Sequence, residues 1–252
     1  MESWSSSASR SRSTMGGELL SDRPAEDVLR LRLNRPDRLN AIDTALVVAL
    51  GAAFDRVDAR AVVLGSTTRE AFCSGADRDL EDAERAEVSD LLYALYEKMV
   101  RLPAPIVVAL EGHAVGAGVQ LAIAGDLRLA GPRARLRVAG PGYGLAVAAW
   151  GLPSLVGRGR AIDLCLTMRA VGAEEALDMG LVDRVEEDPA AAAVDLASGL
   201  ARLDPDAVGR VKRVVAETSG HLEALREERS GNRAAWSGSV AALANRRGEV
   251  GG

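Results

Sequence analysis

Apolar positions recur with two different periods along the chain, which predicts alternating strands and helices. Apolar runs predict strands at Ala61–Gly65 and Ile106–Leu110, the second of them buried, and alternation of apolar residues with arginine predicts a strand at Val28–Leu33. Leu127–Ala130 and Leu136–Val138 are predicted as short strands. Helical spacing of apolar residues predicts helices over residues 43–57, 79–102, 119–124, 157–168 and 173–179. The pattern stays helical from residue 188 onward. We therefore predict an α/β domain over residues 15–200, followed by a C-terminal helical region over residues 201–252.

Residues 1–14 differ from the rest of the chain, because they are rich in serine, contain arginine and show no apolar period. This composition is typical of a disordered extension, which we predict upstream of Met15. A transit peptide is the alternative, although no continuous amphipathic face is visible.

The overall composition argues against several classes of protein. Apolar residues make up 48% of the chain, charged residues 27%, and the net charge is −5, so we expect no nucleic-acid partner. The longest apolar region, 106–130, is interrupted by charged and polar side chains, and we predict no membrane insertion. Cys73 and Cys165 offer no disulfide framework and no metal-ligand spacing. We therefore expect a cytoplasmic protein without a bound metal.

The glycine-rich segment that follows Ile106–Leu110 is the first candidate for chemistry. Gly112, Gly116 and Gly118 interrupt the apolar pattern before the predicted helix 119–124. A strand, a glycine-lined turn and a helix start expose backbone N–H groups at the positive end of a helix, which suits an oxyanion. A tight strand-to-helix connection without further function explains the same pattern. The spacing is not that of a dinucleotide fingerprint, and no Gly-Lys-Ser/Thr follows as in a nucleotide loop.

Five motifs, in the same order, resemble the crotonase (enoyl-CoA hydratase/isomerase) superfamily. They are LRLNRPDRLNAI at 31–42, AFCSGAD at 71–77, GHAVGAGVQLA at 112–122, LVGRGRAIDL at 155–164 and GAEEALDMGLVDRV at 172–185. The resemblance covers most of the chain. It implies a ββα spiral core with a C-terminal helical trimerisation region, and hence a homo-oligomer, either a trimer or a dimer of trimers. On this basis Trp236 is expected near a neighbouring subunit's coenzyme A site or in the trimer core.

The same resemblance implies an acyl-CoA thioester as ligand or substrate, and no other cofactor. The backbone N–H groups of Ala76 and Ala117 match the two donors of the family's oxyanion hole. The resemblance suggests that the thioester contacts Arg38, Leu39, Ala41, Gly75, Ala76, Asp77, Gly116, Ala117, Gln120, Tyr143 and Trp150. The last two are candidate walls of an apolar acyl pocket, together with Leu80, Leu92 and Val138, although such residues are often simply core. Asp79 stands where the family often has a lysine.

The chain departs from the family's hydratases at the groups that transfer protons. Gln120 stands in place of one glutamate, and the segment of the second reads AGPGYGL at 139–145, without a carboxylate. Glutamine does not exchange a proton near neutral pH, whereas a positioned acid or base contributes roughly 10²–10⁴ in rate. His113 has weak support as a replacement, and Asp77 is better explained as an anchor of its turn. We therefore assign no confident catalytic residue and expect similarity to actinobacterial or mycobacterial members that lack both glutamates.

Three functions stay open at this point. The first is an acyl-CoA binding or delivery protein of fatty-acid and lipid metabolism that does not hydrate its ligand. The second is an enzyme that uses the oxyanion hole alone, such as an acyl-CoA decarboxylase, whose enolate forms by loss of carbon dioxide. The third is a weak enoyl-CoA hydratase or isomerase that recruits another acid or base.

Overall fold

The chain folds into two β-sheets that share one α/β core. The structure is a computed structural model that describes residues 13–15 and 17–236. In order across the larger sheet, its strands are β1 (Ser13–Met15), β2 (Leu19–Ala25), β3 (Val28–Leu33), β4 (Ala61–Ser66), β6 (Ile106–Leu110), β8 (Leu127–Ala130) and β11 (Arg184–Val185). The smaller sheet has the order β10 (Ala170–Gly172), β9 (Arg135–Arg137), β7 (His113–Val115) and β5 (Ala71–Cys73).

Successive strands of the core alternate between the two sheets. In the larger sheet β4, β6 and β8 are parallel neighbours, and in the smaller sheet β5, β7 and β9 are parallel neighbours. Each pair β4–β5, β6–β7 and β8–β9 therefore contributes one strand to each sheet. This is the α/β class, built from turns of a ββα spiral, that the sequence predicts.

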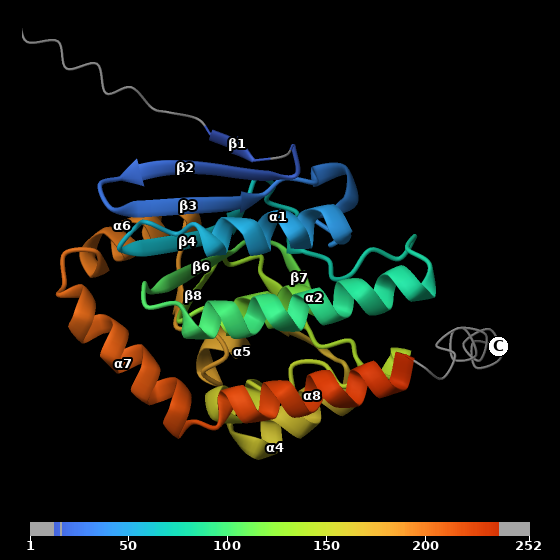
Figure 1. Cartoon of the computed structure of the whole chain (residues 1–252). Helices are drawn as coiled ribbons and strands as arrows, with labels where there is room; N and C mark the ends of the chain where they lie inside the picture. The colour runs from blue at the N-terminus through green and yellow to red at the C-terminus, as the bar shows by residue number, and fades with distance from the viewer. Residues whose placement is uncertain (1–12, 16, 237–252) are drawn as a thin grey trace, which may run out of the picture.

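Helices cover both faces of the larger sheet (Figure 1). They are α1 (Thr44–Asp55), α2 (Asp82–Arg101), α3 (Ala117–Ala124), α4 (Leu152–Thr167), α5 (Ala173–Asp178), α6 (Pro189–Leu200), α7 (Pro205–Thr218) and α8 (His221–Trp236). On one face, the small side chains of α6 pack against Val63 and Val107. On the other face, α1, α2 and α3 enclose the main core with Leu64 and Val108. Alternate residues of each strand thus enter different cores, as the two-residue period of a strand requires.

Several predicted elements agree closely with the observed ones. The bounds of β3, β6 and β8 are those predicted, and α1 begins directly after Asp43, whose carboxylate accepts a hydrogen bond from the Leu46 N–H at 2.9 Å. Helix α4 begins at Leu152, five residues before the predicted start at 157. Gly157 interrupts the helix with a φ of 78°, and the prediction covered only the part that follows this interruption. The segment before this break is helical with a proline in its first turn, the position where proline is tolerated.

The N-terminal boundary differs from the prediction by two residues. Residues 1–12 lie outside the described part of the chain, as do residues 237–252 of the predicted helical region. Ser13 and Thr14, which the prediction placed in a disordered extension, belong to β1 and pair with β2. Within the described residues, no helix has both the length and the apolar character needed to cross a membrane.

The C-terminal helices pack against their own chain, while one side of α7 stays exposed. Helix α8 runs beside α2 (Figure 1), where Arg229 donates two hydrogen bonds to the Asp90 carboxylate at 2.8 and 2.7 Å. The exposed side of α7 carries Val211, Val214 and Val215, which are 64%, 55% and 57% exposed. Packing between subunits stays a prediction, and this apolar surface is available for it.

Candidate functional site

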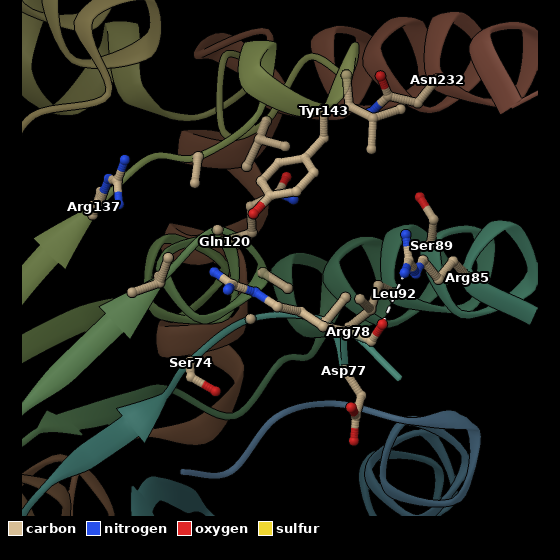
Figure 2. A pocket seen from close by; sticks show the side chains of 18 of the residues that line it. Ser74, Asp77, Arg78, Arg85, Ser89, Leu92, Gln120, Arg137, Tyr143 and Asn232 are labelled. Carbon is tan, nitrogen blue, oxygen red and sulfur yellow. Dashed lines mark hydrogen bonds between the residues drawn. The ribbon is translucent and has the colours of Figure 1, made fainter. Parts of the chain in front are cut away.

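A cavity of about 350 Å³ lies among the loop that follows β5, the start of α3, helix α2, the loop after β9 and the end of α8 (Figure 2). The predicted thioester-binding residues in its walls are Gly75, Ala76, Asp77, Gly116, Ala117, Gln120 and Tyr143. Segments that are far apart in the sequence therefore meet here, as the resemblance implies. The other predicted residues, Arg38, Leu39, Ala41 and Trp150, do not line the cavity that the described residues form.

Hydrogen bonds to Ile42 fix the backbone on either side of Ala76. The Ile42 N–H donates to the Gly75 carbonyl, and the Asp77 N–H donates to the Ile42 carbonyl, both at 2.8 Å. In a parallel bridge of this kind the intervening residue turns its own N–H away from the partner strand, so the Ala76 N–H faces away from Ile42, and Ala76 lines the cavity. No described residue accepts a hydrogen bond from this N–H. Gly75 permits the turn because its φ is 105°, in the region that favours glycine.

Ala117 is the first residue of α3, so its N–H is one of the helix donors without a partner inside the helix. No described residue outside the helix accepts from it either. Gly118 lets α3 begin this close to β5, because a Cβ at residue 118 would lie 2.3 Å from the Cys73 carbonyl oxygen. A Cβ placed on residue 75 would lie 4.0 Å from the Ala117 nitrogen, so the segment at Gly75 passes close to the start of α3. The two predicted donors therefore lie on adjacent segments of one cavity, at the positive end of a helix.

Asp77 anchors the loop that holds Ala76. Its buried carboxylate accepts hydrogen bonds from Arg35 at 3.2 Å, from Arg38 at 3.0 Å and from the Asp79 N–H at 3.1 Å. Burial by itself would raise the pKa of Asp77, but the hydrogen bonds from Asp79, Arg38 and Arg35 hold it below its ordinary value. Asp77 is therefore ionised and fully engaged at neutral pH, which agrees with its interpretation as an anchor.

The loop expected to hold coenzyme A lies beside the cavity. Its conformation is joined to the oxyanion segment, because the Ser74 N–H donates to the Leu39 carbonyl at 3.0 Å. The Arg38 guanidinium pairs with Asp77 and also with Asp79, the residue that replaces the family's lysine. Asp77 and Asp79 thus already neutralise the charge of Arg38, which belongs to this loop. Contact of Arg38, Leu39 and Ala41 with coenzyme A stays a prediction.

Gln120 presents its amide to the cavity from the first turns of α3. Its side-chain oxygen accepts hydrogen bonds from Trp150 Nε1 at 2.9 Å and from the Ala148 N–H at 3.2 Å. Trp150, predicted as a wall of the acyl pocket, is instead core: it is 3% exposed and stacks on Tyr96 with ring centroids 6.2 Å apart. Trp150 bears on the cavity through Gln120, because its Nε1 hydrogen bond holds the Gln120 amide oxygen in place. Trp150 therefore lies behind the wall of this cavity, and its contact with a thioester stays a prediction.

The walls of the cavity are more polar than predicted. Leu92 and Tyr143 line it, whereas Leu80 and Val138 do not. Figure 2 shows Tyr143 beside Gln120 at the centre of the cavity, with Asn232 of α8 above. Arginine side chains also enter the wall, from Arg78, Arg85 and Arg137. Trp236, expected at a neighbouring subunit's site or in a trimer core, lines the cavity of its own chain.

Glu228 of α8 is a buried carboxylate that the sequence interpretation missed. It accepts hydrogen bonds from the Tyr93 hydroxyl at 2.7 Å, from the Ala148 N–H at 3.0 Å and from the Trp150 N–H at 2.9 Å. Tyr93 lines the cavity, whereas Glu228 lies behind it. Burial, and then the Glu228 charge, raise the pKa of the Tyr93 phenol far above its ordinary value, so its hydroxyl stays protonated. Glu228 therefore holds a cavity-lining hydroxyl and the Ala148–Trp150 loop in place.

Other candidate groups lie away from the cavity. His221 Nε2 contacts the Ser154 hydroxyl, but neither residue lines the cavity, and Ser154 donates to the Gly151 carbonyl at 2.8 Å. His113 is exposed on β7 and is not in the wall either. Among the described residues, no group of three or more His, Cys, Asp or Glu side chains is arranged to hold a metal ion.

The buried Glu228 carboxyl should make stability depend on pH. Burial raises its pKa above the ordinary value near 4.5, although hydrogen bonds from Tyr93 and backbone N–H groups oppose the shift. A raised folded-state pKa means that this group stabilises the fold fully below the unfolded-state value and loses that contribution as pH rises through the folded-state value. We expect the melting temperature of Glu228→Gln, relative to the unmodified protein, to increase from pH 4.5 toward neutral pH.

Asp90→Asn is the matched control on the same helix interface. A hydrogen bond from Arg229 lowers the pKa of Asp90 below its ordinary value near 3.8, so its stabilisation is present above that value and is lost as pH falls. The deficit of Asp90→Asn should therefore shrink on acidification, opposite to the trend for Glu228→Gln. Differential scanning fluorimetry across pH measures both melting temperatures. Parallel curves of melting temperature against pH for Glu228→Gln and the unmodified protein would contradict a raised pKa of Glu228.

Comparison with known proteins identifies the family. The family model described as Enoyl-CoA hydratase/isomerase matches residues 23–242. The chain is 41% identical over 207 residues to the protein named "Probable enoyl-CoA hydratase echA6" of Mycobacterium tuberculosis, covering 79% of this chain and 83% of that protein. It is 36% identical over 223 residues to the protein of the same name from Mycobacterium leprae, covering 84% and 88%. The mycobacterial relatives expected from the sequence are thus among the matches.

Solved structures agree with the sequence comparison. The crystal structure of an enoyl-CoA hydratase/isomerase from Mycobacterium paratuberculosis matches with a TM-score of 0.81 and 26% identity, covering 92% of this chain and 99% of that one. The Pseudomonas aeruginosa protein PA4980 matches with a TM-score of 0.72 and 34% identity, covering 86% and 99%. The chain therefore belongs to the enoyl-CoA hydratase/isomerase family of the crotonase superfamily.

Proposed function

We propose that this protein binds acyl-CoA thioesters through the Ala76 and Ala117 N–H groups and lacks ordinary hydratase activity. Its role is the binding or delivery of acyl-CoA in fatty-acid and lipid metabolism, with a cytoplasmic location. The observation that supports the proposal most directly is the pair of N–H donors, which lie on adjacent segments of one cavity without an acceptor among the described residues. A thioester oxygen is an acceptor that suits such a pair.

Few groups in the described wall of the same cavity could transfer a proton. Asp77 is the only carboxylate among its described wall residues, and two arginines and a backbone N–H engage it. Gln120 hydrogen-bonds but does not titrate. The Tyr93 hydroxyl is a donor to Glu228 and has a pKa raised by burial, so it is a poor base. Hydration needs both a base and an acid, and the described wall offers no free carboxylate and no imidazole for either role.

Two alternatives are kept as outcomes of the tests. An acyl-CoA decarboxylase would use the oxyanion hole alone, since loss of carbon dioxide forms the enolate without a base. A weak enoyl-CoA hydratase or isomerase would have to use Tyr93 with Glu228 behind it. The relatives named as probable enoyl-CoA hydratases favour this second alternative by their names. Gln120 and the carboxylate-free segment at 139–145 argue against it.

Hydration of crotonyl-CoA should be negligible, with a kcat below about 1 s⁻¹ against a typical enzyme median of about 10 s⁻¹. Gln120→Glu should restore little, because the new carboxylate would share the Ala148 N–H with Glu228. Two carboxylates that share one hydrogen-bond donor lie close together, which raises the pKa of the pair and leaves one carboxyl protonated. Loss of the enoyl-thioester absorbance measures both rates, and turnover near 10 s⁻¹ in the unmodified protein would exclude a non-hydrating role.

Binding of hexanoyl-CoA should weaken when one oxyanion donor is removed. Ala117 is the first residue of α3, where proline is tolerated, so Ala117→Pro deletes the N–H and keeps the helix. The loss of one hydrogen bond, about 0.5–1.5 kcal/mol, corresponds to a Kd roughly 2- to 10-fold higher. Isothermal titration calorimetry measures it, with Ala117→Ser as the control that retains the N–H. Equal affinity of a folded Ala117→Pro would remove Ala117 from the site, and no binding to the unmodified protein would remove the proposed function.

We also propose that the protein is a trimer or a dimer of trimers, with α7 at the contact. The support is the row of exposed valines on α7, which an isolated chain leaves in water. Light scattering at micromolar concentration should give about three or six times the 26.4 kDa chain mass. Val214→Asp should lower that mass, whereas Val48→Asp, at an exposed valine on α1, should not. A stable monomer would contradict the proposal.

A further inference from the structure

The cavity carries more positive charge than a plain acyl pocket needs. The guanidinium groups of Arg78, Arg85 and Arg137 enter its wall, against the single carboxylate of Asp77. Asp77 is already paired with Arg35 and Arg38, which lie outside the wall. Arg85 also lies 3.5 Å from the Asp82 carboxylate outside the wall, whereas no carboxylate of the described residues pairs with Arg78 or Arg137. An uncharged acyl chain would leave these cations facing apolar carbon.

Two donors in the wall are buried without an acceptor among residues 13–15 and 17–236. They are Arg85 Nε on α2 and Trp236 Nε1 at the end of α8. Trp236 and Ser89 both line a second hollow of about 70 Å³ between α2 and α8. Ser89 follows Arg85 by one turn of α2, so Trp236 lies near the part of α2 that carries Arg85. A buried N–H without a partner is costly and usually indicates a missing acceptor. This end of the cavity thus suits a ligand group that is rich in acceptors.

Arg78 provides a cation close to the oxyanion donors. It follows Ala76 by two residues, and two residues of extended chain span at most about 7 Å. Figure 2 shows its side chain reaching into the cavity toward Gln120. Within the described chain no carboxylate or carbonyl accepts a hydrogen bond from its guanidinium, although its own carbonyl accepts one from Arg85 at 2.8 Å. An anion a few carbons beyond the thioester carbonyl lies within its reach.

We infer that the site selects thioesters whose acyl group ends in a carboxylate, with Arg78 and Arg85 as the residues that determine this specificity. A carboxylate accepts paired hydrogen bonds from a guanidinium, and its remaining lone pairs suit Trp236 Nε1. The inference rests on the proposed function, since it takes the thioester at Ala76 and Ala117 as given. The phosphates of coenzyme A have the same anionic chemistry, so the test separates the two sources.

The experiment compares glutaryl with hexanoyl thioesters, which differ chiefly in a terminal carboxylate. Calorimetric titration uses both as coenzyme A esters and as N-acetylcysteamine esters, which carry no phosphate. We expect glutaryl to bind at least about 10-fold more tightly in both carriers. Arg78→Gln, Arg85→Gln and Trp236→Phe should each reduce the ratio of glutaryl to hexanoyl affinity several-fold, with hexanoyl affinity measured in the same variant as the reference. Arg133→Gln is the matched control, because Arg133 pairs with Glu111 outside the cavity.

Each outcome has a distinct meaning. Equal affinity for glutaryl and hexanoyl esters would overturn the inference and leave the proposed function standing. A loss of affinity in Arg78→Gln and Arg85→Gln that is equal for the two coenzyme A esters and absent with the N-acetylcysteamine esters would assign the arginines to the phosphates and overturn it as well. Failure of every thioester to bind would remove the proposed function itself. A preference kept without phosphates, and lost in Arg78→Gln or Arg85→Gln but not in Arg133→Gln, would support the inference.

Discussion

The close approach of α3 to β5 is the constraint on which the site depends. A side chain at Gly118 would meet the Cys73 carbonyl at 2.3 Å, so the helix could not begin where it does with any other residue. With that contact in place, Ala117 and Ala76, which belong to successive turns of the spiral, face one cavity. The donors are backbone groups, and this half of the site therefore survives changes in the side chains around it. Such changes are what the rest of the cavity displays.

Helix α8 completes the part of the cavity that the α/β core leaves open. Glu228 ties the Ala148–Trp150 loop to Tyr93, and Trp150 in turn fixes the oxygen of Gln120. The orientation of a residue on α3 thus depends on a carboxylate more than a hundred positions later in the chain. An amide held by its oxygen presents N–H groups to a ligand, whereas a glutamate at that position would present acceptors. The C-terminal helix consequently decides which ligand atoms the cavity favours.

The sequence predicts the parts of this structure that local pattern determines. Strand β6 is buried along its whole length and β3 alternates between buried and partly buried residues, so both patterns predict a strand, whereas β5 and β7 have three residues each and form through distant pairing. The resemblance to the family indicated Ala76 and Ala117 as donors, and the structure brings both residues to one cavity. Glu228 could not be predicted, since it lies among charged residues of a helical pattern that also fits a solvent-exposed face. For Trp150 the sequence does not distinguish a cavity wall from the core behind it.

The charge of the cavity bears on the choice between holding a ligand and converting it. Decarboxylation turns a carboxylate into neutral carbon dioxide, so a guanidinium paired with that carboxylate stabilises the ground state more than the transition state and slows the reaction. The oxyanion donors act in the opposite sense, because they stabilise the enolate that forms. With Arg78 and Arg85 in the wall and no free carboxylate or imidazole among the described wall residues, a carboxylated acyl group would be bound at both ends and offered no low-barrier route onward. On the proposed function, this arrangement would favour retention of a thioester over its chemical conversion.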